Sequence, residues 1–477
     1  MYRKTGDQYF DSKEFRNLLS QYETSVETAF PIFMDVDDLT DIADYFHFIG
    51  REDEANVLID KIMELHPNAM GPLIYKVHQA LENQDCDKAR EMADQIVDKE
   101  SLDYLLLVGE ILLAEQKIQQ AEKLFNNNLL IVEGDEVNDY IFDVANLYTD
   151  YGQYDKAMTW IMRCDWRKSP ELMELIAHVL FGLGNYHESE RIFNDLLDTD
   201  PYSVKYWNSL ANAQYMQKKY NEAITSSEYA MAISPEDADG MFMKANCLCQ
   251  MGNHQEAEML FQRYLENNPD DVQAQLTYGT CLILLGKKEE GIAMLENVTR
   301  KLPKDSPFLI ECYEELAFAY SDLHMPESAL FYLDKTDELE CDHIDIKVIK
   351  GHILLANKRV KEAQDMFQEA VMESKNDPKV ILRVIISAYD NHYLNATYHM
   401  LYHFLSTYGD KVVDGYAYMT LCCWDLKKYD ECLAYLKKAL TVNPNEVRQV
   451  LSDLFPPELE LKDYKTYLLD KIKELKS

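Results

Sequence analysis

A helix-turn-helix pattern is clearest in one segment near the middle of the chain. Residues 201–235 read PYSVKYWNSLANAQYMQKKYNEAITSSEYAMAISP. The proline that opens this segment recurs at intervals of 34 residues, at Pro235, Pro269 and Pro303. Proline ends a helix because it lacks a backbone N–H and restricts the residue before it. We therefore expect a helical unit of 34 residues that repeats along the chain.

Two columns of small residues keep the same interval. The first column contains Ala177, Ala211, Ala245 and Gly279, and the second, twelve residues later, contains Ser189, Ala223, Ala257 and Gly291. We expect two antiparallel helices in each unit, with the first column letting helix A approach its own helix B. We expect the second column to let helix B approach the next helix A. Pairs such as Gly184-Asn185 between the helices are typical of a helix C-cap in the left-handed conformation.

These residues resemble a unit of the tetratricopeptide repeat (TPR) family. The marks of the family in this segment are Trp207, Leu210, Ala211, Tyr220, Ala223, Ala230 and Pro235. The segment departs from the family pattern at Gln214 and Ser227, where bulky residues are usual. The resemblance implies an all-α fold, a right-handed superhelical solenoid of helix pairs, in which helix A lines the concave face.

The register extends in both directions to about twelve repeats. The expected repeats start near residues 36, 70, 102, 138, 170, 204, 238, 272, 310, 344, 377 and 413. We therefore predict an N-terminal capping extension over 1–35, a repeat array over 36–446 and a C-terminal capping helix over 447–477. A partner-binding role for the C-terminal helix remains an alternative. Extra residues between two repeats predict a longer loop and a bend near 304–309.

The composition is strongly acidic, with a formal net charge of −37. Nucleic-acid binding needs clustered Lys and Arg to neutralise phosphates, and an anionic membrane surface needs the same. The basic runs here are short, so we expect neither partner. An acidic surface instead favours a partner that is neutral or basic.

The segments that direct proteins to membranes are missing from the sequence. No apolar stretch follows Met1, so we expect no secretory signal, and no run reaches the roughly 18 apolar residues of a membrane span. The ten cysteines show neither a CxxC pair nor a zinc-finger spacing, and most fall in apolar helical patterns. We expect reduced thiols and a cytoplasmic protein.

One row of polar residues lies on helix A, directly after the first small column. It includes Asn146, His178, Asn212, Asn246 and Thr280, and Asn208 stands one turn before Asn212. In the TPR family, asparagines here hydrogen-bond the backbone of an extended peptide. A side-chain amide suits this role because it offers both a donor and an acceptor. We predict a peptide-binding groove from these six residues; the alternative is that they are solvated and idle.

A second row, at the start of helix A, is mostly acidic. It includes Asp103, Asp139, Glu171, Asp239 and Glu311. We predict an acidic rim that attracts a basic segment. The alternative is that these carboxylates serve their own helices, because a negative charge in the first turn is stabilised by the macrodipole and can cap free N–H groups.

Catalytic motifs are not found in the sequence. His399 and His403 have the i, i+4 spacing of a metal pair but lack the glutamate of HExxH. The lysine of the family's clamp for acidic tails is replaced, for example by Glu174 and Asn208. We therefore predict a scaffold or adaptor without catalytic residues, metal or cofactor, which binds a protein or peptide. A ligand-responsive regulatory sensor remains the alternative function, and the oligomeric state is left open.

Overall fold

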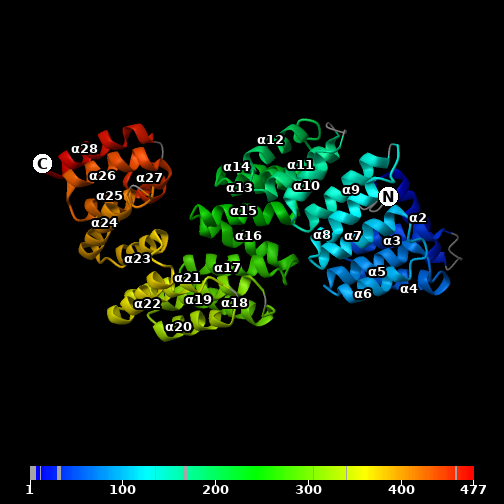
Figure 1. Ribbon diagram of the computed structural model, residues 1–477, viewed down its shortest axis with the longest axis horizontal. Coiled ribbons are helices and arrows are strands. Elements are labelled where there is room, and N and C mark those ends of the chain that lie inside the picture. Colours follow the sequence, from blue (N-terminus) through cyan, green and yellow to red (C-terminus); the bar gives the residue numbers. More distant parts are fainter. Residues whose placement is uncertain are drawn as a thin grey trace. The chain divides into compact units, whose positions relative to one another are not determined.

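The computed structural model is entirely helical in the part of the chain that it describes, with no strand. It describes residues 7–10, 12–28, 34–134, 136–164, 169–304, 306–339, 341–409, 411–456 and 459–476. The chain divides into two compact units, Met1–Cys247 and Leu248–Ser477, so that the division falls inside one helix, α15. Each unit is described by itself below (Figure 1).

The first unit begins with one short helix and one helix of 16 residues, and continues as helix pairs. Its helices are α1 (Asp7–Phe10), α2 (Lys13–Thr28), α3 (Val36–Phe48), α4 (Glu52–Leu65), α5 (Met70–Glu82), α6 (Cys86–Asp94), α7 (Leu102–Ala114), α8 (Ile118–Leu129), α9 (Glu136–Asp150), α10 (Tyr154–Ile161), α11 (Pro170–Gly182), α12 (Tyr186–Leu197), α13 (Val204–Met216), α14 (Tyr220–Ile233) and most of α15 (Ala238–Gln250). From α3 to α14, each odd-numbered helix packs against the even-numbered helix that follows it.

The second unit continues the same order and ends in a short helical region. Its helices are the end of α15, α16 (His254–Asn267), α17 (Val272–Leu284), α18 (Lys288–Lys301), α19 (Phe308–Asp322), α20 (Pro326–Asp334), α21 (His343–Ala356), α22 (Val360–Glu373), α23 (Pro378–Asp390), α24 (Leu394–Tyr408), α25 (Tyr416–Asp425), α26 (Tyr429–Val442), α27 (Pro444–Val450) and α28 (Tyr464–Lys476). Three 3₁₀ segments, Lys335–Glu338, Ser452–Leu454 and Leu461–Asp463, join them.

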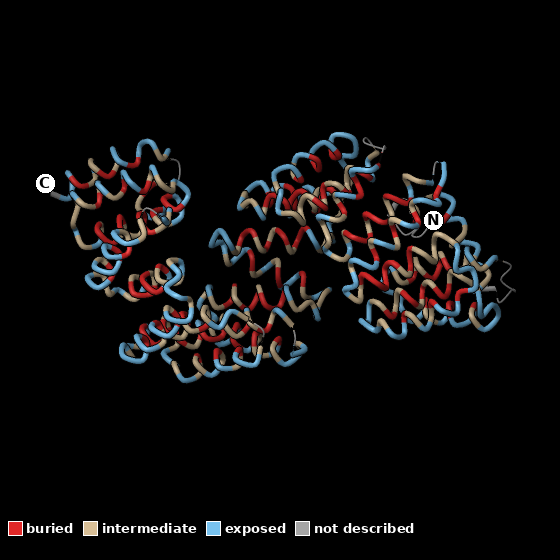
Figure 2. The backbone as a smooth tube through the Cα atoms, in the orientation of Figure 1, coloured by how far each residue is buried: buried red, intermediate tan, exposed pale blue. Residues whose placement is uncertain are grey.

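The predicted all-α solenoid of helix pairs is confirmed. Twelve successive helix-turn-helix segments, from α3/α4 to α25/α26, occur in the described residues, and in eleven of them, all but α15/α16, the two helices pack together. Each first helix starts within three residues of its expected position. The four repeating prolines lie in the connections that follow α12, α14, α16 and α18. Buried residues recur along one side of most helices in Figure 2, as expected for amphipathic helices stacked into layers.

Several odd-numbered helices start at a residue that caps their free N–H groups. The side chain of Ser203 accepts the N–H of Tyr206, and Asp271 accepts the N–H of Ala274. Such caps stabilise a helix by roughly 1 kcal/mol, because they satisfy donors that have no partner within the helix. The chain therefore encodes the start of these helices locally, before any packing is considered.

The turn inside every pair has the same backbone conformation. Its middle residue has a positive φ in all twelve pairs: Gly50, Gln84, Gln116, Gly152, Gly184, Lys218, Gly252, Gly286, His324, Lys358, His392 and Lys427. At Gly184 this conformation lets the N–H of Asn185 reach the carbonyl oxygen of Leu180 at 2.8 Å, which closes a Schellman motif. The predicted left-handed C-cap is therefore present, and seven of the twelve turns adopt it without glycine.

The two small columns meet each other inside one repeat. Ser189 Oγ donates to the carbonyl oxygen of Ala177 at 2.8 Å. A Cβ placed on Gly291 would stand 2.5 Å from the carbonyl oxygen of Gly279. These contacts lie within one repeat, whereas Ala223 of the second column also lies in one cluster with Met243 and Cys247 of the next first helix, α15. The expectation that the second column faces the next helix A stays a prediction for Ser189 and Gly291. Both columns are small because helix A and its own helix B touch through their backbones.

Both ends of the repeat array are covered by additional helices. Phe10 and Phe15 are buried against the first repeat, together with Leu18, Leu19 and Tyr22. At the other end, Tyr464, Leu468 and Ile472 of α28 lie in the same cluster as the last repeat, whereas Leu475 is exposed. The carboxylate of Glu446 also accepts the N–H of Gly415 at 2.5 Å and that of Ala417 at 3.2 Å, at the start of α25.

The predicted bend falls in the connection between α18 and α19. This connection runs from Leu302 to Pro307, and Asp305 within it lies outside the described residues. The predicted bend and the predicted domain boundaries stay predictions. None of the described helices combines the length and the apolar character that crossing a membrane would need.

Candidate functional site

The six predicted groove residues lie on the first helices of five consecutive repeats. Asn146 is on α9, His178 on α11, Asn208 and Asn212 on α13, and Asn246 on α15, all in the first unit, whereas Thr280 is on α17 in the second unit. Each residue therefore lies on the helix that the repeat register predicted. Their joint role in binding stays a prediction.

Two of the groove side chains have partners in their own helix. Asn146 Nδ2 donates to the carbonyl oxygen of Phe142 at 3.2 Å. His178 Nε2 lies 3.7 Å from Glu174 Oε1, and Lys205 Nζ lies 2.5 Å from the same oxygen. Burial acts to raise the pKa of Glu174, but the hydrogen bonds from His178 and Lys205 outweigh it and lower this pKa. A ligand that bound His178 would compete with this network.

Asn208 is almost fully buried, with 9% of its surface exposed. Its Nδ2 donates to Asp237 Oδ2 at 2.9 Å, and the same oxygen accepts the N–H of Gly240 at 2.7 Å. The amide of Asn208 therefore connects α13 to the start of α15. Its Oδ1 has no hydrogen-bond partner among the described residues. This oxygen is shielded from solvent, so Asn208 serves the packing of α13 against the start of α15.

Asn212 and Asn246 keep more of their amide groups available. Asn212 is exposed, and no hydrogen bond occupies its side chain within the described ranges. Asn246 is half-buried, and its Oδ1 has no partner among the described residues. An unsatisfied buried acceptor costs roughly 1–3 kcal/mol. This oxygen is shielded from solvent, so a peptide N–H would remove that cost only after displacing the atoms that cover it.

The predicted acidic residues lie in the first turns of their helices. Asp139, Glu171, Asp239 and Glu311 are exposed, and Asp103 is half-buried. For two of these helices a serine supplies the cap: Ser101 Oγ accepts the N–H of Tyr104, and Ser169 Oγ accepts that of Leu172. Capping therefore does not require Asp103 or Glu171. Partial desolvation and the charge of Asp237 raise the pKa of Asp239.

Three carboxylates on α19 form a group that the sequence reasoning named only in part. Glu311, Glu314 and Glu315, called the α19 carboxylates below, have the i, i+3, i+4 spacing that places side chains on one helix face. Desolvation raises the pKa of all three. The charge of Glu311 raises the pKa of Glu315 further, although a hydrogen bond from Thr280 acts against this. The spacing was the signal that could have identified the group.

Cations do not neutralise the α19 carboxylates directly. No ion pair within the described ranges involves any of them, and the nearby Arg383 pairs instead with Asp345 on α21. Half-buried carboxylates of the first unit are different, because Glu190 lies 2.7 Å from Lys219 Nζ and Glu115 pairs with Arg90. Desolvated carboxylates without a cation are a natural place for a positive ligand group.

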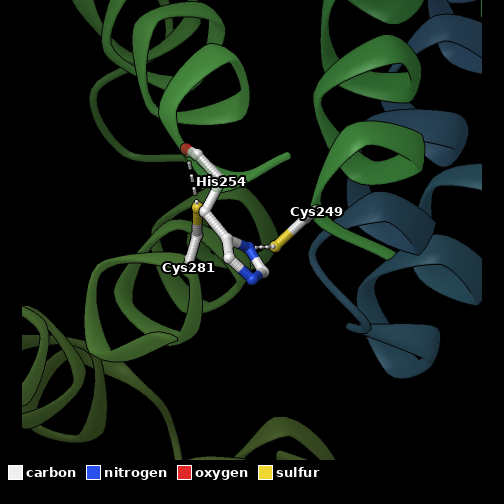
Figure 3. A group of neighbouring side chains, drawn as sticks. All are labelled: Cys249, His254 and Cys281. Atoms are coloured by element: carbon white, nitrogen blue, oxygen red, sulfur yellow. Dashed lines mark hydrogen bonds between the residues drawn. The ribbon is translucent and has the colours of Figure 1, made fainter. Parts of the chain in front are cut away.

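A cluster of two cysteines and a histidine forms at the start of the second unit (Figure 3). Cys249 Sγ lies 3.7 Å from His254 Nδ1, and Cys281 Sγ lies 3.6 Å from the carbonyl oxygen of His254. A hydrogen bond from Cys281 is the main reason why the pKa of Cys249 is lowered, and the same contact raises the pKa of Cys281. Three different helices contribute these residues.

This cluster was not predicted from the sequence, because Cys249 and Cys281 are 32 residues apart and match no CxxC or zinc-finger spacing. The repeat register contains a usable signal: it places Cys249 at the end of one helix A, His254 at the start of its helix B and Cys281 on the next helix A. By contrast, His399 and His403 are exposed on α24. In the part of the chain that the structure describes, no third metal-ligating side chain joins those two histidines.

Comparisons with known proteins support the repeat assignment. A family model described as anaphase-promoting complex, cyclosome, subunit 3 matches residues 210–298. Two models described as tetratricopeptide repeat match residues 175–239 and 421–446. These matches confirm the resemblance to TPR proteins.

Individual relatives are distant. The chain is 22% identical over 267 residues to the tetratricopeptide repeat-containing protein trd-1 of Caenorhabditis elegans, covering 55% of this chain and 33% of the relative. It is 24% identical over 208 residues to the NatA auxiliary subunit N-alpha-acetyltransferase 16 of Mus musculus, covering 42% and 24%. The chain thus spans a third or less of these two relatives.

A solved structure of a tetratricopeptide repeat protein from Parabacteroides merdae is also similar, with 17% identity. It matches 52% of this chain and 98% of its own chain, with a TM-score of 0.43.

Proposed function

We propose that this tetratricopeptide repeat protein is a scaffold or adaptor without catalytic activity that binds a segment of a partner protein along its first helices. The repeat matches and the twelve helix pairs support this proposal. One matching family model is described as a subunit of the anaphase-promoting complex, and one relative is described as the NatA auxiliary subunit. The location we propose for the protein is the reducing cytoplasm, because all ten cysteines are free thiols.

The proposed partner segment is basic. The reason for this proposal is the group of α19 carboxylates. Desolvation raises the pKa of all three, although Glu311 is exposed at the surface, and no ion pair among the described residues involves them. The charge of Arg383 lowers the pKa of Glu314 only in part, because its guanidinium group pairs with Asp345. A Lys or Arg of the partner would supply the missing countercharge, and charge complementarity of this kind gives specificity and fast association. The exposed carboxylates Asp139, Glu171 and Asp239 would steer such a segment in the first unit.

The asparagines supply the proposed contacts to the partner backbone. Asn212 and Asn246 stand 34 residues apart, at the same position of successive first helices. Both have free amide atoms, which match the N–H and C=O of an extended peptide. Hydrogen bonds to a peptide backbone do not distinguish between peptide sequences. The acidic residues would therefore select basic peptides over others.

A peptide titration tests the proposed function on the full chain. Fluorescently labelled peptides of equal length, one rich in Lys and Arg and one with these residues replaced by Gln, are compared by anisotropy at two salt concentrations. We expect the basic peptide to bind more tightly and to lose affinity as the salt concentration rises, since salt screens exposed charge pairs. Equal binding of both peptides contradicts the proposed selectivity.

A matched pair of charge variants identifies the binding surface. Glu311→Gln/Glu314→Gln/Glu315→Gln removes three charges from α19. The control Glu289→Gln/Glu290→Gln/Asp365→Asn removes three charges from exposed positions on the second helices α18 and α22. We expect about a tenfold loss of peptide affinity in the first variant and less than about a threefold loss in the control, because only the first set is desolvated. Equal losses of peptide affinity in the two variants would mean that net charge, and not the position of the α19 carboxylates, determines binding.

A further inference from the structure

Three potential metal ligands converge at the ends of three consecutive helices in the second unit. Cys249 lies in the last turn of α15, His254 is the first residue of α16, and Cys281 lies on α17. The two Sγ atoms and a ring nitrogen of His254 all lie within 4.8 Å of one another. No other group of three such side chains occurs in the described residues. Figure 3 shows the imidazole directed at the sulfur of Cys249.

The turn between α15 and α16 explains why Cys249 and His254 meet. Gly252 has a φ of +79°, and the N–H of Asn253 reaches the carbonyl oxygen of Leu248 at 2.9 Å. This Schellman turn reverses the chain within three residues, which brings the end of one helix beside the start of the next. The two side chains are therefore held by backbone geometry rather than by a flexible loop.

Packing of the next repeat adds the third ligand. α16 lies against α17, and Cys281 on α17 is fully buried. Its Sγ lies 3.6 Å from the carbonyl oxygen of His254, so the thiol stands beside the first turn of α16. The repeat stacking thus places a second sulfur next to a Cys–His pair that the turn has already formed.

We propose that Cys249, His254 and Cys281 bind one Zn²⁺ ion through Sγ, Nδ1 and Sγ, with the fourth position open to water or to an external ligand. Zn–S bonds of about 2.3 Å and Zn–N bonds of about 2.0 Å place tetrahedral S and N ligands roughly 3.6 Å apart. The observed separation of 3.7 Å between Cys249 Sγ and His254 Nδ1 fits this value. A small inward movement of Cys281 completes the site.

The donor set suits zinc rather than a hard cation. Two thiolates and a neutral imidazole are soft and borderline ligands, which Mg²⁺ and Ca²⁺ avoid. Both cysteines bind as thiolates, so binding releases to solvent whatever protons the two thiols still carry. The two negative charges then balance the charge of the ion, so that the half-buried site carries no net charge.

A bound ion would connect α15, α16 and α17 by direct bonds. Few links of this kind exist in a repeat array, where each unit contacts its neighbours mainly through apolar side chains. Zinc would therefore stabilise the start of the second unit and raise its thermal midpoint, as any ligand of the folded state does. The open fourth position would let a partner side chain or a small thiol join the ion.

Cobalt titration of the purified full chain tests the proposal directly. The protein is reduced with a phosphine, stripped of metal and titrated with Co²⁺, which reports its ligands by absorption. We expect one Co²⁺ per chain, a thiolate-to-cobalt charge-transfer band in the near ultraviolet and the visible bands of tetrahedral Co²⁺. Added Zn²⁺ should abolish all of them by displacement. Their absence at saturating Co²⁺ overturns the proposal.

Variants identify the ligands, and the chain offers a matched control. Cys341 Sγ also lies 3.7 Å from a histidine, at His343 Nδ1, but no second cysteine completes that pair. We expect Cys249→Ser, Cys281→Ser and His254→Ala to weaken Co²⁺ binding by more than about 100-fold, because loss of an outer partner alone costs roughly 10–100-fold. Cys341→Ser should bind Co²⁺ as the unmodified chain does. Retained binding in the first three variants refutes the assignment.

An alkylation experiment keeps the test valid if a variant fails to fold. The unmodified chain is treated with iodoacetamide, with and without Zn²⁺, and modified cysteines are identified by mass spectrometry. We expect Zn²⁺ to protect the half-buried Cys249 at least about tenfold, with Cys341 unchanged and a chelator reversing the effect. Equal protection of all cysteines, or none, contradicts the proposed site.

Discussion

Gly291 on α18 approaches Gly279 on α17 so closely that a Cβ on Gly291 would stand 2.5 Å from the carbonyl oxygen of Gly279. The same Cβ would stand 2.7 Å from a side-chain carbon of Ile283. Each repeat depends on this contact between the two small columns, because a larger residue would separate its two helices. In an earlier repeat, Ser189 on α12 contacts Ala177 on α11 through a hydrogen bond from its hydroxyl group.

The first prediction concerns this contact. Gly291→Ala should lower the free energy of unfolding of the second unit by about 1–3 kcal/mol, because a backbone oxygen cannot move aside as a side chain can. Ala293→Ser, at an exposed position of the same helix, serves as the control and should change stability by less than about 0.5 kcal/mol. Urea unfolding followed by circular dichroism measures both, and equal effects would contradict the prediction.

The second prediction concerns the left-handed turns. Lys358 has a φ of +63°, which strains a residue with a Cβ, and Lys358→Gly should raise stability by about 0.5–1 kcal/mol. The reverse exchange, Gly286→Ala, should lower stability by about 1 kcal/mol. A Cβ on Gly286 would meet no atom within 4 Å, so that only its backbone angle opposes alanine. Shifts of the same sign in both variants, measured by thermal unfolding, would exclude this explanation.

The third prediction concerns the polar row. Asn212→Ala/Asn246→Ala should weaken binding of the basic peptide about tenfold, because two backbone contacts of roughly 0.5–1.5 kcal/mol each are lost. The thermal midpoint should not fall, since the Asn212 side chain and Asn246 Oδ1 have no hydrogen-bond partner among the described residues. Unchanged affinity in an anisotropy titration would remove these asparagines from the proposed groove. Asn208→Ala is the contrasting variant, since it should lower stability by breaking the bond to Asp237.

The fourth prediction concerns the pH dependence of stability. Desolvation raises the pKa of the α19 carboxylates in the folded chain, so the folded state holds more protons than the unfolded state between the ordinary and the raised pKa values. Stability then falls as the pH rises through this window. Glu311→Gln/Glu314→Gln/Glu315→Gln should therefore raise the thermal midpoint at pH 7 and lose most of this advantage near pH 4.

The charge-matched control separates this effect from a change in net charge. Glu289→Gln/Glu290→Gln/Asp365→Asn alters exposed carboxylates and should leave the pH profile of the thermal midpoint close to that of the unmodified chain. If both variants shift the midpoint equally at pH 7, long-range repulsion rather than local desolvation accounts for the gain.

The repeat register by itself determined the helical architecture of this protein. Second helices end before four regularly spaced prolines, Pro201, Pro235, Pro269 and Pro303. The small columns mark where the two helices of a repeat contact each other. These signals are local or strictly periodic, so one sequence is enough to read them. The same register placed the polar row and the acidic row on the first helices of the pairs.

Only the tertiary structure decided which of those residues are buried, paired or brought together. Asn208 donates a hydrogen bond to Asp237, and the α19 carboxylates form no ion pair among the described residues. Cys249 and Cys281, 32 residues apart in the sequence, lie within hydrogen-bond distance of each other. Burial and pairing depend on neighbouring helices, whose side chains are distant in the sequence. Periodicity predicts the face on which a side chain lies, whereas packing sets its solvation and its partners.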